Sequence, residues 1–268
     1  SVTGLGTPFT ALSGSIQAFP NGWYRCVLMA TSNTATALRI LVQPETAAGT
    51  ISYTGDGSGV YVWGAQLEQA AVASSYIPTT TAAVVRNTDV LTYSTTGWLN
   101  TIAGTLFAQW RQFVVSSGGT RNCLSLDDGT ANNRVCLSQV TGAGTSEQFV
   151  VVDSSVSQAA PNNGAISANT DYKTSGAYVA NSFQTARAGV LATEDTSGTV
   201  PTGLATLSVG MQNSTGTSPF FGPIRRVAYF PRRLLNATLV TLTGTDLTFD
   251  PATFPVALPD NTTAYRAE

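Results

Sequence analysis

The sequence is organised around the stretch Tyr53-Thr54-Gly55-Asp56-Gly57-Ser58-Gly59-Val60-Tyr61-Val62-Trp63-Gly64-Ala65-Gln66-Leu67-Glu68, in which a glycine-rich turn leads into an alternating segment. Glycine and aspartate favour a turn between 55 and 59, because they adopt left-handed backbone angles at little cost. Beyond Val60, aromatic and aliphatic residues recur at every second position, which is the period of a β-strand. Both faces are apolar near Val60–Val62, so the pattern predicts a central strand of a β-sandwich.

The segments around this stretch carry a resemblance. Gly22-Trp23-Tyr24-Arg25 precedes it, and Ser75-Tyr76-Ile77-Pro78-Thr79 follows it. In order and spacing, residues 18–90 resemble the C-terminal half of a carbohydrate-binding-like β-sandwich, a module often appended to bacteriophage tail and other virion proteins. The resemblance implies that residues 1–89 form a sandwich that lacks its N-terminal strands ahead of Ser1.

Composition favours strands over helices throughout. The chain has 268 residues, of which 43% are hydrophobic and only 10% are charged, and Lys173 is its one lysine. A chain of this length suits one large or two modest domains, and its charged fraction is well below the roughly 25% of ordinary globular proteins. Abundant Thr, Val, Tyr and Gly with little Lys or Glu predicts an all-β protein.

A second run of strand patterns begins near Val90 and ends near Thr243. Apolar alternation between turn clusters predicts strands at Leu91–Ser94, Gly104–Val115, Asn122–Leu126, Arg134–Gln139, Glu147–Asp153, Asp171–Ala180, Thr185–Leu191, Leu204–Met211 and Pro223–Tyr229. Short strands at this spacing indicate an all-β sandwich over residues 90–243. One helix is expected at Asn236–Thr243, with Asn236 as its N-cap and Gly244 as its stop. Residues 244–268 are expected to form a C-terminal tail.

The end of this run carries a second resemblance. Gly222-Pro223-Ile224-Arg225-Arg226-Val227-Ala228-Tyr229-Phe230-Pro231-Arg232-Arg233-Leu234-Leu235-Asn236 resembles the closing strand and short helix of a laminin-G-like, concanavalin A-like jelly roll, and Gly104–Trp110 resembles an early strand of that fold. The fold class that follows is two such β-sandwiches in tandem. This fold hosts lectins, glycosidases and structural spacers alike, so it does not decide the function.

The sequence argues against an enzyme. It contains no histidine, which excludes Ser-His-Asp and Cys-His catalysis. Glycoside hydrolysis needs two carboxyl groups directed at one bond. The adjacent pairs Asp127-Asp128 and Glu194-Asp195 lie in polar turns, where neighbouring side chains point in different directions.

Metal and disulfide chemistry are weakly indicated. Asp56 in its glycine turn is the one candidate for Ca²⁺, although lone Asp-Gly turns usually only turn the chain, and no other cofactor is expected. Cys26, Cys123 and Cys136 make an odd number of cysteines. Cys123 and Cys136 could face each other across a hairpin, and a buried reduced pair is favoured over a bond between them.

Glycan binding requires flat aromatic faces beside groups that hydrogen bond to hydroxyls. Trp63 and Trp110 lie inside alternating segments and are expected in the core. Trp98 follows a Thr-Thr-Gly turn and is the better candidate for a stacking face. The predicted carbohydrate site combines Trp98 and Tyr76 with acceptors on Asp127 and Asp128.

Two functional hypotheses follow from the residues and the resemblances. The first is a phage virion protein, such as a tail fibre, that binds host surface carbohydrate on the outside of the particle. The second is a virion spacer or decoration protein without a glycan ligand. A net charge of −2 and the lack of a roughly 20-residue apolar run argue against nucleic acid and against membrane insertion. A homo-oligomer is expected, with a trimer favoured, in contact with other virion proteins.

Overall fold

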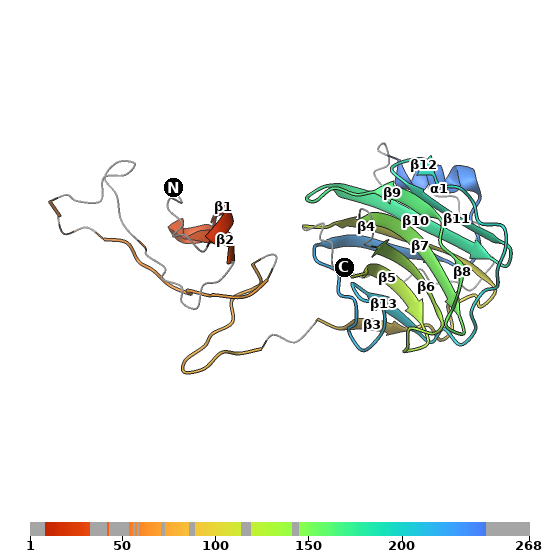
Figure 1. The fold of residues 1–268 in the computed structure, drawn as a ribbon, viewed down its shortest axis with the longest axis horizontal. Helices are drawn as coiled ribbons and strands as arrows, with labels where there is room; N and C mark the ends of the chain where they lie inside the picture. Colours follow the sequence, from red (N-terminus) through yellow and green to blue (C-terminus); the bar gives the residue numbers. More distant parts are fainter. Residues whose placement is uncertain are drawn as a thin grey trace. The chain divides into compact units, whose positions relative to one another are not determined.

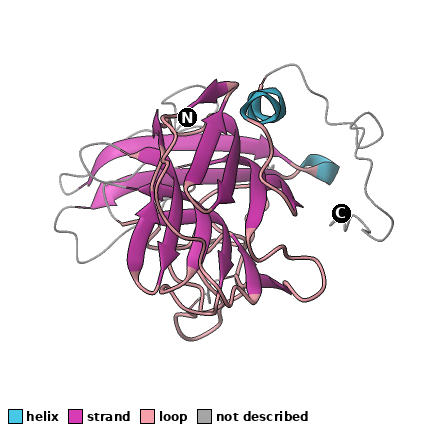
Figure 2. Ribbon diagram, turned by 90° about the vertical axis from the view of Figure 1, so that its right-hand side faces the viewer, coloured by secondary structure: helices cyan, strands magenta, loops and turns pink. Residues whose placement is uncertain are grey.

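The chain divides into unit 1, Ser1–Val85, and unit 2, Arg86–Glu268. The structure is a computed structural model, and it describes residues 9–32, 42, 54–55, 57, 59–70, 73–85, 89–113, 119–140 and 145–244 (Figure 1). The expected all-β class is confirmed, because strands make up most of the regular structure of the described residues and the longest helix among them has eight residues (Figure 2). No helix in these ranges has the length and apolar character that crossing a membrane requires.

Unit 1 contains one small sheet in its described part. Strand β1 (Phe9–Ala18) pairs antiparallel with β2 (Tyr24–Ser32), and the 3₁₀ turn η1 (Pro20–Gly22) joins them. Asn21 and Gly22 both adopt positive φ angles in this turn, at 62° and 77°, which suits Asn and Gly.

The predicted strand at Val60–Glu68 is wrong. These residues carry no regular secondary structure, and Gly64 has a φ of 69°. A left-handed residue interrupts the alternation that a strand needs. The ring of Tyr76 lies 3.6 Å from the position that a Cβ of residue 64 would occupy, so the backbone turns at the place where this ring packs. Trp63 is 72% exposed and packs at a tilt against Tyr76 with ring centroids 4.7 Å apart, so its expected core position is also wrong.

Unit 2 is a sandwich of two sheets with antiparallel pairing. One sheet has five strands in the order β12-β11-β10-β4-β14: Val190–Leu191, Ser182–Arg187, Asp171–Val179, Ala103–Arg111 and Ile224–Phe230. The other has seven, in the order β3-β13-β5-β6-β7-β8 with β9 also paired to β7: Leu91–Ser94, Thr206–Val209, Arg121–Asp127, Arg134–Val140, Ser146–Asp153, Val156–Ala159 and Asn162–Ala165. Strands distant in sequence are therefore neighbours, as β4 and β14 are.

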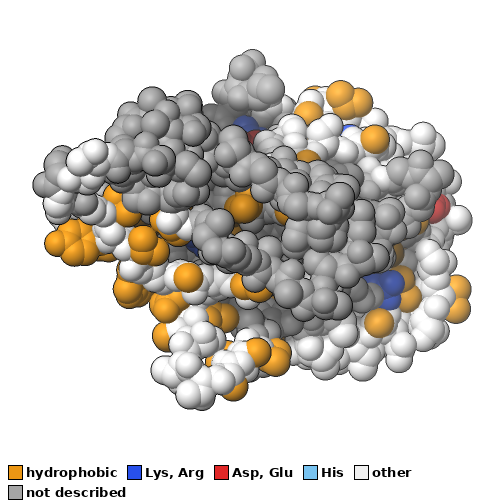
Figure 3. All heavy atoms as spheres, turned by 60° about the vertical axis from the view of Figure 1, so that its left-hand side comes forward, with side chains coloured by type: hydrophobic (Ala, Val, Ile, Leu, Met, Phe, Trp, Pro, Cys, Tyr) orange, Lys and Arg blue, Asp and Glu red, His pale blue; other side chains and the backbone are white. Residues whose placement is uncertain are grey.

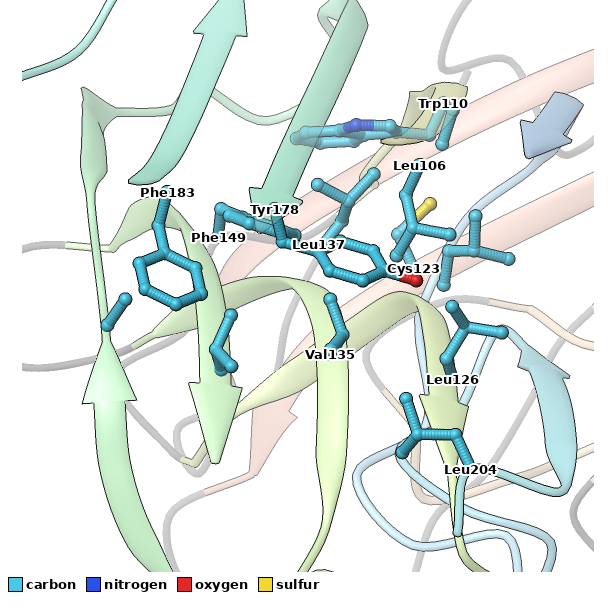
Figure 4. Packing of buried hydrophobic residues seen from close by; sticks show 14 of the residues in the cluster. Leu106, Trp110, Cys123, Leu126, Val135, Leu137, Phe149, Tyr178, Phe183 and Leu204 are labelled. Carbon is cyan, nitrogen blue, oxygen red and sulfur yellow. The ribbon is translucent and has the colours of Figure 1, made fainter. Parts of the chain in front are cut away.

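The core of unit 2 fills the space between these sheets. Trp110 and Tyr178 come from the five-stranded sheet, and Leu137 and Phe149 come from the seven-stranded sheet; all four are fully buried (Figure 4). The indole Nε1 of Trp110 donates to Thr174 Oγ1 at 3.1 Å, so its one polar atom is satisfied inside the core. The expected core position of Trp110 is confirmed.

The helix α1 (Asn236–Thr243) covers the opposite face of the five-stranded sheet. Leu239 and Leu242 are buried against Phe107, Ala177 and Ala186. The predicted bounds are confirmed, but the N-cap is Leu235 and not Asn236. Asn236 is instead the first helical residue, and its Oδ1 accepts a hydrogen bond from Arg233 Nη2 at 3.0 Å. At the other end, the Gly244 N–H donates to the carbonyl oxygens of Val240 and Thr241.

The two cysteines of unit 2 lie on opposite faces of the seven-stranded sheet. Cys123 belongs to the core between the sheets, while Cys136 alternates with the core residues Val135 and Leu137 and so faces outward. Both thiols are buried and free, and burial raises the pKa of each. Cys123 and Cys136 therefore do not face each other across the hairpin, although the sequence left that arrangement open.

A glycine sets how closely the two sheets approach. A Cβ on Gly176 of β10 would lie 2.1 Å from the ring of Phe149 on β7. We expect Gly176→Ala to lower the free energy of unfolding by about 1–3 kcal/mol, because a buried ring and a strand would have to shift. Denaturant unfolding measures the change. Gly59→Ala is the control, since a Cβ there meets no atom within 4 Å. Equal stability of the two variants would contradict this packing.

Candidate functional site

A cleft of about 330 Å³ lies on the outer face of the seven-stranded sheet. Its floor comes from β5, β6 and β7, whose side chains alternate between the core and this face. We call it the polar cleft, because amide, hydroxyl and guanidinium groups outnumber apolar ones along it. Its lining residues are Thr120, Asn122, Arg134, Ser138, Val140, Gln148, Val150, Ser157, Ala160, Gln212 and Ser218.

Asn122 lies at the floor with one half of its amide unsatisfied. Its Oδ1 accepts a hydrogen bond from Ser138 Oγ at 2.5 Å, on the neighbouring strand. Its Nδ2 is buried and has no hydrogen-bond partner among the described residues. A buried donor left without a partner costs about 1–3 kcal/mol, so this group has much to gain from an acceptor that enters the cleft.

One wall of the cleft is the loop 212–218, which hydrogen bonds hold in place. The Asn122 N–H donates to the Ser218 carbonyl at 3.1 Å, which fastens the loop to β5. Ser218 Oγ donates to Gln212 Oε1 at 3.2 Å, and the Gln212 N–H donates to the Thr217 carbonyl at 2.9 Å. Asn213 Oδ1 accepts from Thr215 and Thr217 inside the loop. The wall is therefore held in place before a ligand arrives, which lowers the entropic cost of binding.

Arg134 is the one charged residue in the lining. Its guanidinium donates to the Ala131 carbonyl, and no ion pair joins it to a carboxylate in the described parts of the chain. The Cys136 side chain also interacts with this guanidinium, and a guanidinium has five N–H donors, so donors remain to bind a ligand. The cleft thus presents donors and one positive charge, with acceptors supplied by the amide and hydroxyl oxygens.

The structure places the four predicted carbohydrate-binding residues outside this lining. Trp98 is half-buried; its Nε1 donates to the Ser94 carbonyl at 2.6 Å, and its ring packs edge-on against Tyr229 with centroids 5.1 Å apart. Tyr76 belongs to unit 1, and its ring packs at a tilt against the ring of Trp63. The role of these residues in glycan binding stays a prediction.

Asp127 and Asp128 have different hydrogen-bond partners. The expected position of Asp127 in a polar turn is wrong, because Asp127 is the last residue of β5. Asp127 is fully buried and accepts from Ser208 Oγ at 2.7 Å and from the Gly129 N–H at 2.9 Å, and its burial raises its pKa. Burial alone would raise the pKa of Asp128, but hydrogen bonds from Thr130 and Asn133 lower it below its usual value. The Asp127 carboxylate thus joins β5 to β13 and to the turn, and the Asp128 carboxylate holds the turn.

Asp56, the Ca²⁺ candidate, lies outside the described residues. Within the described ranges, no three His, Cys, Asp or Glu side chains come close enough to hold a metal ion. The polar cleft contains none of these residue types, so its chemistry is that of hydrogen bonding and one cation.

Sequence reasoning missed the residues of the polar cleft. Asn122, Arg134 and Gln148 sit on three strands and share a face only through the register that pairs Asn122 with Ser138 and Ser138 with Gln148. The available signal was weak: on β6 the polar residues Arg134 and Ser138 alternate with the core residues Val135 and Leu137.

Comparisons with known proteins give structural likeness only. No protein-family model and no curated protein matches the sequence. The CBM40 module of Ruminococcus gnavus IT-sialidase bound to α2,3-sialyllactose matches with a TM-score of 0.44 and 16% identity, over 54% of this chain and 83% of that one. The leech intramolecular trans-sialidase matches with a TM-score of 0.46 and 14% identity, over 61% and 27%. The SAP-like pentraxin of Limulus polyphemus gives 0.40 and 12%, over 52% and 68%. Likeness of this degree does not show a shared function.

A buried carboxyl inside the sandwich makes stability depend on pH. Burial raises the pKa of Glu147 to about 7, against the hydrogen bond from Asn163 Nδ2 and the charge of Arg187, which lower it. Because the folded protein holds this proton more tightly than the unfolded chain, the contribution of Glu147 to stability is fully present below about pH 4.5 and is lost as the pH rises to about 7. A shift of this size corresponds to about 3 kcal/mol.

We expect the difference in unfolding free energy between Glu147→Gln and the parent protein to grow in favour of the variant from pH 4.5 to pH 8. Gln keeps the shape of the side chain and carries no ionisable proton. Denaturant unfolding at each pH gives this difference, and Glu194→Gln is the control, since its carboxylate pairs with Arg233 and its pKa is lowered. A difference that stays constant across this range would show that Glu147 does not titrate there.

Proposed function

We propose that unit 2 binds a glycan in the polar cleft. The observation that carries the proposal is the unpartnered, buried Nδ2 of Asn122 at the floor of a cleft lined by amides and hydroxyls. Sugar hydroxyls are both donors and acceptors, and side-chain amides match them with one group of each kind. The volume of about 330 Å³ lies at the lower end of the range for ligand sites, which suits one or two sugar rings.

The lining favours an acidic glycan over a neutral one. Arg134 brings a positive charge with free donors, and no Asp or Glu lines the cleft to balance it. A guanidinium binds a carboxylate or sulfate through two parallel hydrogen bonds. Val140, Val150 and Ala160 supply the small apolar surfaces against which sugar C–H groups pack. The same lack of paired carboxyl groups favours binding without hydrolysis.

The wider role that fits this activity is host attachment by a phage virion protein on the particle surface. Support for it comes from the resemblance of residues 18–90 to sandwich modules of virion proteins. A spacer or decoration role without a ligand is the second candidate. It is favoured by the exposed apolar side chains of unit 1, which suit contact with other proteins.

We expect Arg134→Ala to weaken binding of an acidic glycan roughly tenfold or more, because hydrogen bonds to a charged group contribute about 1.5–3 kcal/mol. Gln148→Ala should weaken binding of neutral and acidic glycans alike. A glycan array identifies the ligand, and calorimetry on that ligand gives the change in dissociation constant.

Arg232→Ala is the matched control, because it removes an exposed arginine of unit 2 outside the cleft. Its affinity should equal that of the parent protein. If Trp98→Ala abolishes binding while Arg134→Ala and Gln148→Ala do not, the site is the one predicted around Trp98. A parent protein that binds no glycan on the array leaves the spacer role as the better hypothesis.

A further inference from the structure

The three cysteines of the chain lie in three different surroundings. Cys26 is exposed in unit 1, which carries most of the exposed large apolar side chains of the described residues; side chains of this kind stand out in orange on the face drawn in Figure 3. Cys123 belongs to the core between the two sheets. Cys136 is buried on the outer face of the seven-stranded sheet, between Arg134 and Ser138 along β6, and both of these residues line the polar cleft.

The Cys136 thiol has polar partners, unlike a cysteine that only fills space. Its Sγ lies 3.2 Å from Ser138 Oγ and 3.7 Å from the Val150 carbonyl oxygen. The guanidinium of Arg134 also forms a hydrogen bond with this side chain. A guanidinium can only donate, so the sulfur accepts from Arg134. The thiol therefore connects the one charged residue of the cleft lining with Ser138.

The number of protons available fixes the direction of the hydrogen bonds from Cys136 to Asn122. Ser138 has one hydroxyl proton and donates it to Asn122 Oδ1 at 2.5 Å, because an amide oxygen is a much better acceptor than sulfur. Ser138 Oγ must then accept from Cys136, whose S–H donates. Burial raises the pKa of this thiol, so it keeps its proton at neutral pH. Since Asn122 is held through its oxygen, its buried Nδ2 is the half of the amide left for a ligand.

We propose that Cys136 is a positioning residue of the polar cleft: its thiol links Arg134 to Ser138 and sets the direction of the chain that ends on Asn122. Both ends of this chain then offer N–H donors to the ligand. The inference rests on the proposed glycan binding and narrows its ligand class. The ligand carries a carboxylate or sulfate for Arg134 and a second oxygen acceptor for Asn122. A sugar with an ammonium group in the same place is rejected, because it meets a like charge and donors without acceptors.

The direction of the chain can be tested without any ligand, through the infrared S–H stretching band of Cys136. Subtracting the spectrum of Cys136→Ala from that of the parent protein isolates this band. An S–H group that donates to an oxygen absorbs at lower frequency than a free one, so Ser138→Ala should move the band to higher frequency. An unchanged band would show that the thiol donates to the Val150 carbonyl instead, and would overturn the proposal.

The role in binding is tested by nuclear magnetic resonance titration with three sugars that differ in one group: glucuronate, glucose and glucosamine. The parent protein should bind glucuronate most tightly and glucosamine least. Cys136→Ala should lower the preference for glucuronate over glucose roughly threefold, as the loss of one modest hydrogen bond implies. Cys136→Ser should keep the preference, because a hydroxyl also accepts from Arg134 and donates to Ser138.

Cys123→Ala is the matched control, since it removes a buried thiol from the neighbouring strand on the opposite face of the sheet. It should lower the thermal midpoint and leave the preference among the sugars unchanged. A Cys136→Ala variant with the parent's preference would overturn the positioning role. A parent protein that binds none of the three sugars, or all three equally, would count against the proposed function and this ligand class, whereas the infrared band decides the hydrogen-bond chain separately.

Discussion

Burial between two sheets is the constraint on which unit 2 depends. Trp110, Leu137, Phe149 and Tyr178 can be buried only if each strand directs alternate residues inward. The remaining residues must then face outward, and the outer faces of the two sheets differ. Helix α1 covers it on the five-stranded sheet, whereas on the seven-stranded sheet it carries the polar cleft. The position of the cleft is thus a consequence of the same alternation that builds the core.

Alternation also explains which elements the sequence could reveal. The long strands of unit 2 and the helix at Asn236–Thr243 follow clear periods and were predicted within a few residues. Strands β8 and β9 were missed, because Val156-Ser-Gln-Ala159 and Asn162-Asn-Gly-Ala165 are short and largely polar. The strand prediction at Val60–Glu68 is wrong for the opposite reason. Its pattern is strong, but Gly64 adopts a left-handed conformation against the ring of Tyr76, a contact that no local period contains.

The candidate site could not be predicted from the sequence for a different reason. Asn122, Arg134 and Gln148 are unremarkable one by one, and they form a site only through strand register and through the loop Gln212–Ser218 that closes one wall. Conversely, Trp98 has a flat aromatic face of the kind that stacks on a sugar ring. Its indole N–H already donates to the Ser94 carbonyl, however, and its ring already packs against Tyr229. Residue type indicates what a side chain can do, and the neighbours decide whether it is free to do it.

The size of the polar cleft limits how tightly a single copy of the chain can bind a glycan. A cleft that accommodates one or two sugar rings offers few hydrogen bonds, and most of their free energy offsets the cost of displacing water from hydroxyls. Binding at one such cleft would therefore be weak. If several copies of the cleft were linked, the second cleft to engage a glycan-coated surface would bind at an effective concentration set by its tether, and avidity would rise by about 10²–10⁴ without any new contact.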